Sequence, residues 1–162
     1  MGIEIERKFL VLDDSWKKEV IRRISIRQGY VQCENHATVR VRIADHEAYL
    51  TIKSPRGISG LTRTEFNYPI PAEDADVLLK SVCSQGLVEK FRNIVPAGNG
   101  LIWEIDEFAG ANTGLVMAEL ELPSPDTPFE RPSWLGKEVT DDYRYYNSNL
   151  VAHPYTDWEK EV

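Results

Sequence analysis

The sequence predicts a mainly β protein with flanking helices, an α+β domain whose eight antiparallel strands close into a barrel with a polar, charged lumen. Short runs that alternate apolar and polar residues recur along nearly the whole chain, which is typical of strands with one buried face. Turn-like pairs such as Asn35-His36 and Asp45-His46 separate these runs and favour hairpin connections. The apolar faces are rich enough to form a core outside the charged faces, beneath the helices. A two-sheet sandwich is the structural alternative.

The first half of the chain supplies five expected strands and one helix. The opening run, GIEIERKFLV, alternates strictly. A helix is expected over 13–25, because Trp16, Val20 and Ile24 recur at helical spacing behind capping aspartates. The stretch 55–61 contains proline and glycine and is expected to be a loop. The expected strands of this half are, in order, 2–11, 27–34, 37–44, 47–54 and 62–70.

The second half supplies the other helix and three strands. The helix is expected over 71–86, which starts with proline and acidic residues and ends at a glycine. A Gly-Asn-Gly sequence at 98–100 predicts a hairpin. A proline-rich surface passage over 123–136 follows the last expected strand, and the terminal 154–162 fits either a short helix or disorder. The expected strands of this half are 87–95, 101–109 and 114–122.

Length and composition indicate a single domain over residues 1–162, with 42% hydrophobic and 28% charged residues. A net charge of −7 argues against nucleic acid or a membrane surface as a partner. No apolar run reaches membrane-spanning length and the start lacks a signal-peptide pattern, so we expect a cytoplasmic protein. Cys33 and Cys83 are expected to be reduced thiols, and three histidines are too few for a persuasive zinc site.

The charged residues are sorted by strand. The basic pairs are Arg40 with Arg42 and Lys90 with Arg92, and the acidic pairs are Glu104 with Asp106 and Glu119 with Glu121. Further charges that share strand faces are Glu4, Glu6, Lys8, Lys53, Arg63 and Glu65. A solvated face would be the simple interpretation of any one strand. Sorting by sign, together with the use of arginine pairs, instead favours a common lumen, where unpaired charges would be costly.

A polyanion held with divalent metal ions would compensate the unpaired charges of such a lumen. The planar fork of arginine donates two hydrogen bonds to a phosphate, and lysine acts as a compact point charge. Carboxylates repel phosphate but hold Mg²⁺ or Mn²⁺, which bridges to phosphate oxygens. No Walker A loop is present, so side chains would have to bind the phosphates. The pattern therefore indicates metal-assisted phosphoryl chemistry.

The motif EIERK resembles the N-terminal ExExK signature of the CYTH superfamily, also called triphosphate tunnel metalloenzymes. The resemblance continues in family order through TVRVR, LTIKS, TEF, VEKFR, WEIDEF, AELEL and EVTDDYRY, and so covers nearly the whole chain. The compact length and the PSWLGKEVT…RYYNSNL ending are most similar to bacterial members regarded as inorganic triphosphatases.

The resemblance implies an eight-stranded tunnel that binds a linear triphosphate with Mg²⁺ or Mn²⁺. The residues implied to bind phosphate are Lys8, Arg40, Arg42, Lys53, Lys90 and Arg92, with Arg63 as either a phosphate ligand or part of an edge salt bridge. The residues implied to hold metal are Glu119, Glu121, Asp106, Glu104 and Glu65, with Glu4 and Glu6 binding a second metal or orienting the attacking water. The catalytic set is Glu4, Glu6 and Lys8. Asn67 stands where relatives often have a second glutamate, which bears on second-metal affinity or substrate preference.

The expected reaction is hydrolysis of inorganic tripolyphosphate to diphosphate and phosphate. Nucleoside or thiamine triphosphate hydrolysis and adenylate cyclase chemistry are alternatives within the superfamily. A non-catalytic polyphosphate-binding module is the alternative of a different class, and the retained acidic pairs argue against it. The expected partner is a small-molecule triphosphate, and a homodimer is left open.

Overall fold

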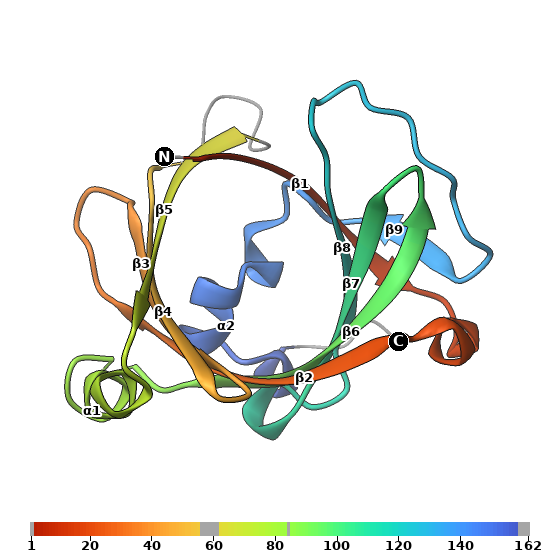
Figure 1. The fold of residues 1–162 in the computed structure, drawn as a ribbon. Coiled ribbons are helices and arrows are strands. Elements are labelled where there is room, and N and C mark those ends of the chain that lie inside the picture. Colours follow the sequence, from red (N-terminus) through yellow and green to blue (C-terminus); the bar gives the residue numbers. More distant parts are fainter. Residues whose placement is uncertain (1, 56–61, 84, 159–162) are drawn as a thin grey trace.

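The computed structural model describes residues 2–55, 62–83 and 85–158, and most of them form one antiparallel β-sheet (Figure 1). The strands are β1 (Gly2–Val11), β2 (Arg22–Val31), β3 (Thr38–Ala44), β4 (Glu47–Lys53), β5 (Thr62–Ile70), β6 (Val88–Gly98), β7 (Leu101–Phe108), β8 (Val116–Glu121) and β9 (Leu135–Glu138). The helices are α1 (Ala72–Ser81), α2 (Asn147–Ala152) and the short 3₁₀ turns η1 (Ser15–Glu19), η2 (Gly110–Asn112), η3 (Tyr143–Tyr145) and η4 (Tyr155–Asp157).

The sheet is curled, and β1 pairs with three strands, β5, β8 and β9. The strand order is β5-β4-β3-β2-β6-β7-β8-β1-β9, with a further pairing between β1 and β5. Residues 2–5 of β1 pair with β5, and residues 6–10 pair with β8. Figure 1 shows the strands arranged around a central space. The curl gives the sheet one inner and one outer face.

The predicted number of eight strands is wrong, because the described residues form a sheet of nine strands. The additional strand, β9, lies at the end of the proline-rich passage and pairs with the last residues of β1. Glycine permits this pairing at Gly136, where a Cβ would lie 2.8 Å from the Leu10 carbonyl oxygen. The predicted eight-stranded closed barrel is therefore not confirmed in the form that the alternation suggested.

The predicted helix over 13–25 is also wrong. A single 3₁₀ turn, η1, is followed directly by β2, which pairs with β6 from Arg22 onward. The apolar residues from Trp16 to Ile24 fit a helical spacing, but Ile24 and Ile26 equally fit the alternation of a strand. Pairing with β6 decides between these two periods, so tertiary contacts override the local pattern. The other predicted helix is present as α1, although it ends at Ser81.

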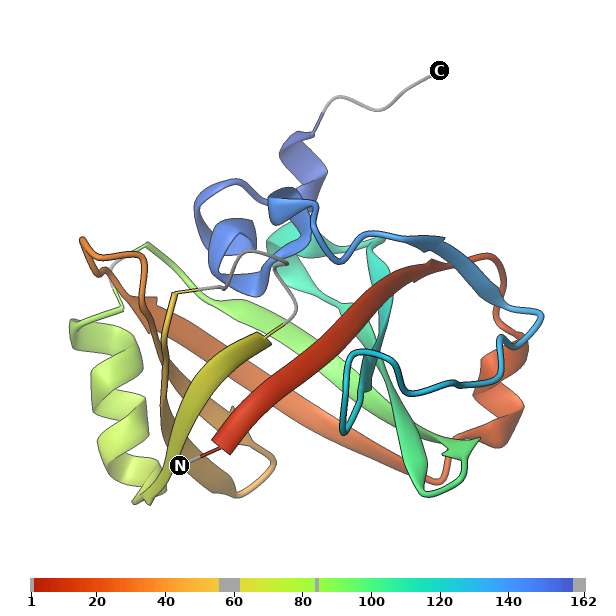
Figure 2. The ribbon, with the colours of Figure 1, turned by 90° about the horizontal axis from the view of Figure 1, so that it is seen from above.

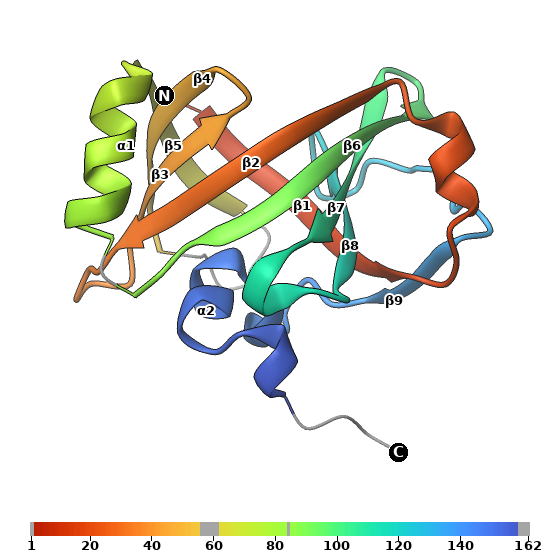
Figure 3. The ribbon, with the colours of Figure 1, turned by 90° about the horizontal axis from the view of Figure 1, so that it is seen from below.

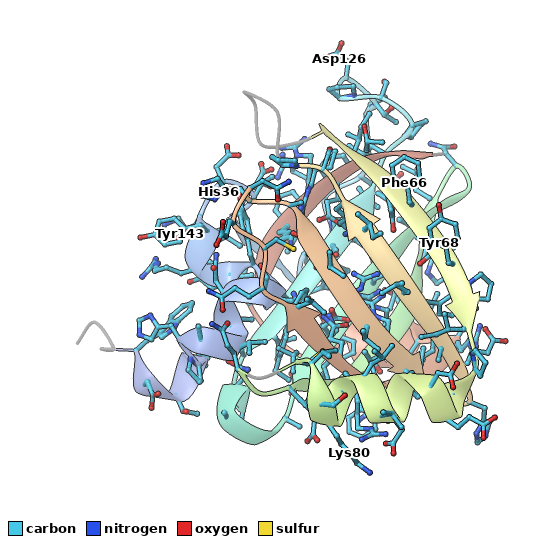
Figure 4. All side chains as sticks on the ribbon, turned by 90° about the vertical axis from the view of Figure 1, so that its left-hand side faces the viewer. His36, Phe66, Tyr68, Lys80, Asp126 and Tyr143 are labelled. Carbon is cyan, nitrogen blue, oxygen red and sulfur yellow. The ribbon has the colours of Figure 1, made fainter. Side chains whose placement is uncertain are left out.

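Two apolar clusters lie on the outer face of the sheet, as the apolar faces of the strands predicted. Helix α1 covers β3 and β4, where Ala75 and Leu79 pack against Val41 and Ala48 (Figures 1 and 4). A second cluster contains aromatic residues of β1 and β7, and the Phe9 and Trp103 rings lie 5.8 Å apart in an edge contact. These clusters hold the strands so that their alternate residues face the inside of the curl.

The C-terminal segment, residues 143–158, covers one end of the curled sheet (Figures 2 and 3). Leu150 and Val151 of α2 pack with Val88, Phe108 and Met117, and this apolar cluster fastens the segment. The sequence pattern predicted neither α2 nor its position. No helix in the described part of the chain is long and apolar enough to cross a membrane.

Candidate functional site

A cavity of about 320 Å³ lies on the inner face of the curled sheet. Every strand from β1 to β8 lines it with at least one side chain, and residues 146–148 of the C-terminal segment line it as well. On β5, Glu65 and Asn67 line the cavity while Phe66 and Tyr68 point away from the sheet (Figure 4). Strand alternation therefore aims the polar residues inward.

The structure brings most of the predicted site residues together. Those that line the cavity are Glu6, Lys8, Arg40, Arg42, Lys53, Arg63, Glu65, Lys90, Arg92, Glu104, Glu119 and Glu121. The side chain of Glu4 lies outside the described part, although its backbone pairs with that of Arg63. Asp106 does not line the cavity but is fully buried behind it.

The inner charges are segregated around the sheet. Lys8 lies opposite Glu119 in the pairing of β1 with β8, and Glu6 lies opposite Glu121. Glu119 also lies opposite Glu104 in the pairing of β7 with β8. The three neighbouring strands β1, β8 and β7 thus form an acidic side. The arginines of β3 belong to the other side of the strand order.

Asp106 anchors two bases. Its Oδ1 accepts a hydrogen bond from Arg92 Nε at 2.8 Å, and its Oδ2 accepts one from Arg92 Nη2 at 2.9 Å. Lys90 Nζ lies 2.7 Å from the same Oδ2. Burial acts to raise the pKa of Asp106, but Arg92 and Lys90 hold it below its usual value. Both carboxylate oxygens are therefore occupied by bases, and the predicted metal-holding role has no support in this geometry.

Lys8 stands between two carboxylates. Its Nζ lies 3.8 Å from Glu6 Oε1 and 3.6 Å from Glu119 Oε1. The same ammonium group is 5.3 Å from the centre of the Tyr146 ring. Burial acts to raise the pKa of Glu119, but Lys8 and Arg92 hold it well below its ordinary value. Glu119 is therefore an anion at neutral pH.

Arg40 and Arg42 are held by neutral groups. Arg42 Nε donates to Gln28 Oε1 at 2.7 Å, and Arg40 Nη2 donates to Thr51 Oγ1 at 3.3 Å. The Nε of Arg40 is buried and has no hydrogen-bond partner in the described part of the chain. Burial, followed by the charges of Arg40 and Arg92, lowers the pKa of Arg42 to about 9. Within the described residues neither of these β3 arginines forms an ion pair, which leaves a concentration of positive charge suited to an anion.

Several cavity residues escaped the sequence analysis. Gln28 and Tyr30 lie on the inner face of β2. Their alternation within the predicted strand 27–34 was a usable signal, but neither side chain carries a charge, and the prediction of the site used charged residues only. Asn147 reaches the cavity from α2, and no local pattern could have indicated it.

Asn67, which the sequence analysis named, accepts a hydrogen bond from the Thr51 hydroxyl at 2.5 Å. Because Thr51 also accepts from Arg40, Asn67 belongs to the hydrogen-bond network around Arg40.

The acidic side offers the donor type that a hard divalent cation prefers. Glu6, Glu104, Glu119 and Glu121 all reach the cavity, and carboxylate oxygens suit Mg²⁺ and Mn²⁺. Among the residues described, no three such side chains are grouped closely enough to form a metal-binding cluster. The residues thus fit the metal by their chemistry, with Lys8 Nζ lying between two of the candidate ligands.

Comparisons with known proteins give a consistent answer. The sequence profile of the CYTH domain matches residues 2–155. A protein of Acetivibrio thermocellus named inorganic triphosphatase is 42% identical over 160 residues, which is 99% of this chain and 100% of that one. Another inorganic triphosphatase, from Nitrosomonas europaea, is 34% identical over 91% of this chain and 96% of its own. A crystal structure of an inorganic triphosphatase superposes with a TM-score of 0.65 at 32% identity, covering 94% of this chain and 96% of that one.

Proposed function

The chain belongs to the CYTH domain family, and on that premise we propose that it hydrolyses a linear triphosphate, inorganic tripolyphosphate, to diphosphate and phosphate. Two relatives similar over nearly the whole chain carry the name inorganic triphosphatase. The observation that carries the proposal is the state of the β3 arginines. Arg40 and Arg42 face the cavity without an ion pair among the described residues, opposite a carboxylate-lined side. A multiply charged anion with a bound cation satisfies both sides together.

We assign phosphate binding to the inner bases, which line the cavity of the curled sheet. Arg40 and Arg42 would make the strongest contacts, because none of the described carboxylates pairs with them. The remaining members of the set are Lys8, Lys53, Arg63, Lys90 and Arg92. Arg92 and Lys90 already share the charge of Asp106, so they would contribute more to the geometry of the site than to its net charge.

We assign metal binding to the acidic side, with Glu119 and Glu121 as principal ligands and Glu6 and Glu104 as further members. The sequence pattern adds Glu4 of β1 and Glu65 of β5 to this proposed set. Mg²⁺ or Mn²⁺ bound there would neutralise charge on the phosphate oxygens and polarise a water molecule. We do not include Asp106 among the metal ligands. Both of its carboxylate oxygens accept hydrogen bonds from Arg92, and its Oδ2 also forms an ion pair with Lys90.

The chain's own residues support an in-line displacement. Glu6 is placed to orient the attacking water, whose oxygen bonds to the terminal phosphorus while the bridging P–O bond breaks. Lys8 stabilises the charge that builds up on the phosphoryl oxygens, and Arg40 and Arg42 stabilise the departing diphosphate. The proton released from water passes to a carboxylate of the acidic side. No covalent enzyme intermediate is required.

The test is metal-dependent phosphate release from tripolyphosphate, ATP and thiamine triphosphate, measured for wild type, Glu119→Ala and Arg42→Ala. We expect turnover of tripolyphosphate that EDTA abolishes and that both variants reduce at least about 100-fold. Full activity in Glu119→Ala would rule out its metal role. Preference for ATP or thiamine triphosphate would assign the alternative substrates, and formation of cyclic AMP would indicate a cyclase.

Binding of tripolyphosphate without turnover in the wild type would identify a polyphosphate-binding module. A cytoplasmic location and a homodimer stay predictions of the sequence.

A further inference from the structure

Two buried amide side chains connect the C-terminal segment to the phosphate-binding bases. Gln28, on β2, is fully buried, and Asn147, on α2, is 8% exposed. Gln28 Nε2 donates to Asn147 Oδ1 at 3.2 Å and to Tyr30 Oη at 2.7 Å. Both amides lie in the cavity wall, although they come from elements 119 residues apart in sequence.

The bases fix the orientation of both amides. The Nε of Arg42 can only donate, so the Gln28 oxygen must face it, and the two are 2.7 Å apart. Lys90 Nζ donates to Asn147 Oδ1 at 2.7 Å. An amino group has enough N–H donors for Asn147 and Asp106 whether it is charged or neutral. The chain of hydrogen bonds is therefore consistent from Arg42 through Gln28 and Asn147 to Lys90.

The neutrality of these acceptors distinguishes them from the carboxylates elsewhere in the cavity wall. Asp106 holds Arg92 through two hydrogen bonds and cancels one positive charge. Gln28 holds Arg42 with a hydrogen bond of similar length and cancels none. A base held by an amide is fixed in position and keeps its full charge for a bound anion.

We infer that Gln28 and Asn147 are positioning residues for the triphosphate site. Gln28 holds Arg42 through a neutral acceptor, and Asn147 holds Lys90, which already pairs with Asp106, without adding a second negative charge. The C-terminal segment is thereby part of the substrate site. This inference rests on the proposed function, because it concerns the same cavity. It adds the requirement that the acceptor at position 147 be uncharged.

Asn147→Asp tests this requirement with little change in structure. A carboxylate keeps the oxygen that accepts from Lys90 and Gln28, and no hydrogen bond is described for the Asn147 Nδ2 that it replaces. We expect an unfolding temperature above that of Asn147→Ala, because the new carboxylate still accepts from Lys90 and Gln28. We expect the KM for tripolyphosphate to rise about 10- to 100-fold with kcat changed less than about threefold.

Two further variants complete the design. Asn147→Ala removes the acceptor, and we expect it to lower stability and raise KM together. Ala152→Asp adds the same charge at an exposed position of the same helix and should change neither parameter. A purely structural role for Asn147 predicts that the aspartate restores stability and affinity alike, and that result would overturn the inference.

Binding of inorganic tripolyphosphate in EDTA, measured by calorimetry, separates this test from the test of catalysis. Tight binding by wild type and binding weakened at least about 10-fold in Asn147→Asp support the inference even if no turnover occurs. Equal binding by the two proteins overturns the inference and leaves the triphosphatase activity in place. Absence of binding to the wild type in EDTA overturns the inference, and the turnover assay with metal decides the proposed function separately.

Discussion

Replacing Asp106 with asparagine tests whether this residue anchors bases or holds metal. The substitution keeps the size of the side chain and removes its charge. Asp106 is fully buried, and its Oδ2 accepts a hydrogen bond from Arg92 Nη2 and forms an ion pair with Lys90 Nζ. In the variant, the amide can keep an oxygen toward Arg92 Nε, but its NH₂ group then faces the two donors that met Oδ2.

The expected fall in the free energy of unfolding follows from the loss of this buried negative charge. Removing one partner of a buried ion pair costs roughly 3–5 kcal/mol, because the remaining charge stays buried without compensation. For a chain of this length, that loss corresponds to a fall of roughly 10 °C in unfolding temperature. Asp76→Asn is the matched control, because Asp76 pairs with Lys80 on the exposed face of α1 and its loss should cost little.

The assay is thermal and urea unfolding of wild type and variant in EDTA and in Mg²⁺. If Asp106 anchors the two bases, the variant loses the same free energy of unfolding in EDTA and in Mg²⁺. Tripolyphosphate should restore part of the lost stability, since a bound anion compensates the charges of Arg92 and Lys90 that Asp106 no longer pairs. An unfolding temperature within 2 °C or so of wild type in EDTA, together with loss of the stabilisation by Mg²⁺, would refute the anchor and restore the metal ligand.

The remaining predictions concern affinity, strand pairing and pH. Arg40→Met should leave the free energy of unfolding within about 0.5 kcal/mol of wild type while weakening tripolyphosphate binding at least about 10-fold, as measured by calorimetry, because an arginine without an ion pair serves binding more than folding. Gly136→Ala should cost about 1–3 kcal/mol in urea unfolding, because its Cβ would meet the Leu10 carbonyl oxygen at 2.8 Å; an unchanged value would show that β9 can shift freely. Hydrogen bonds from Arg7 hold the pKa of Glu138 below its ordinary value, so this pair stabilises the fold above the unfolded pKa and the contribution is lost as the pH falls through the folded pKa. Glu138→Gln should therefore lose less than about 1 kcal/mol at pH 7 and approach wild type at acidic pH, and a constant difference across pH would contradict that origin.

Strand alternation was informative wherever both faces had a clear character. It placed Arg40 and Arg42 on the inner face of β3, and the glutamates of β8 on the inner face of their own strand, in the same cavity. It failed over 13–25, where Ile24 satisfied a helical and a strand period equally and pairing with β6 made the choice. A local pattern cannot contain that pairing, because the partner lies about 70 residues away in the chain.

The sequence by itself determined the inventory of the site: which strands bring bases, which bring acids, and that both face inward. This follows because the direction of a side chain on a strand depends only on parity along the chain. Only the tertiary structure decided what each charge contacts. Asp106 became the partner of Arg92 and Lys90, Arg42 met a neutral amide, and Asn147 entered the cavity from the C-terminal segment. Such contacts depend on the register between strands and on where the C-terminal segment packs, and these are set by the free energy of the whole fold rather than by any local stretch.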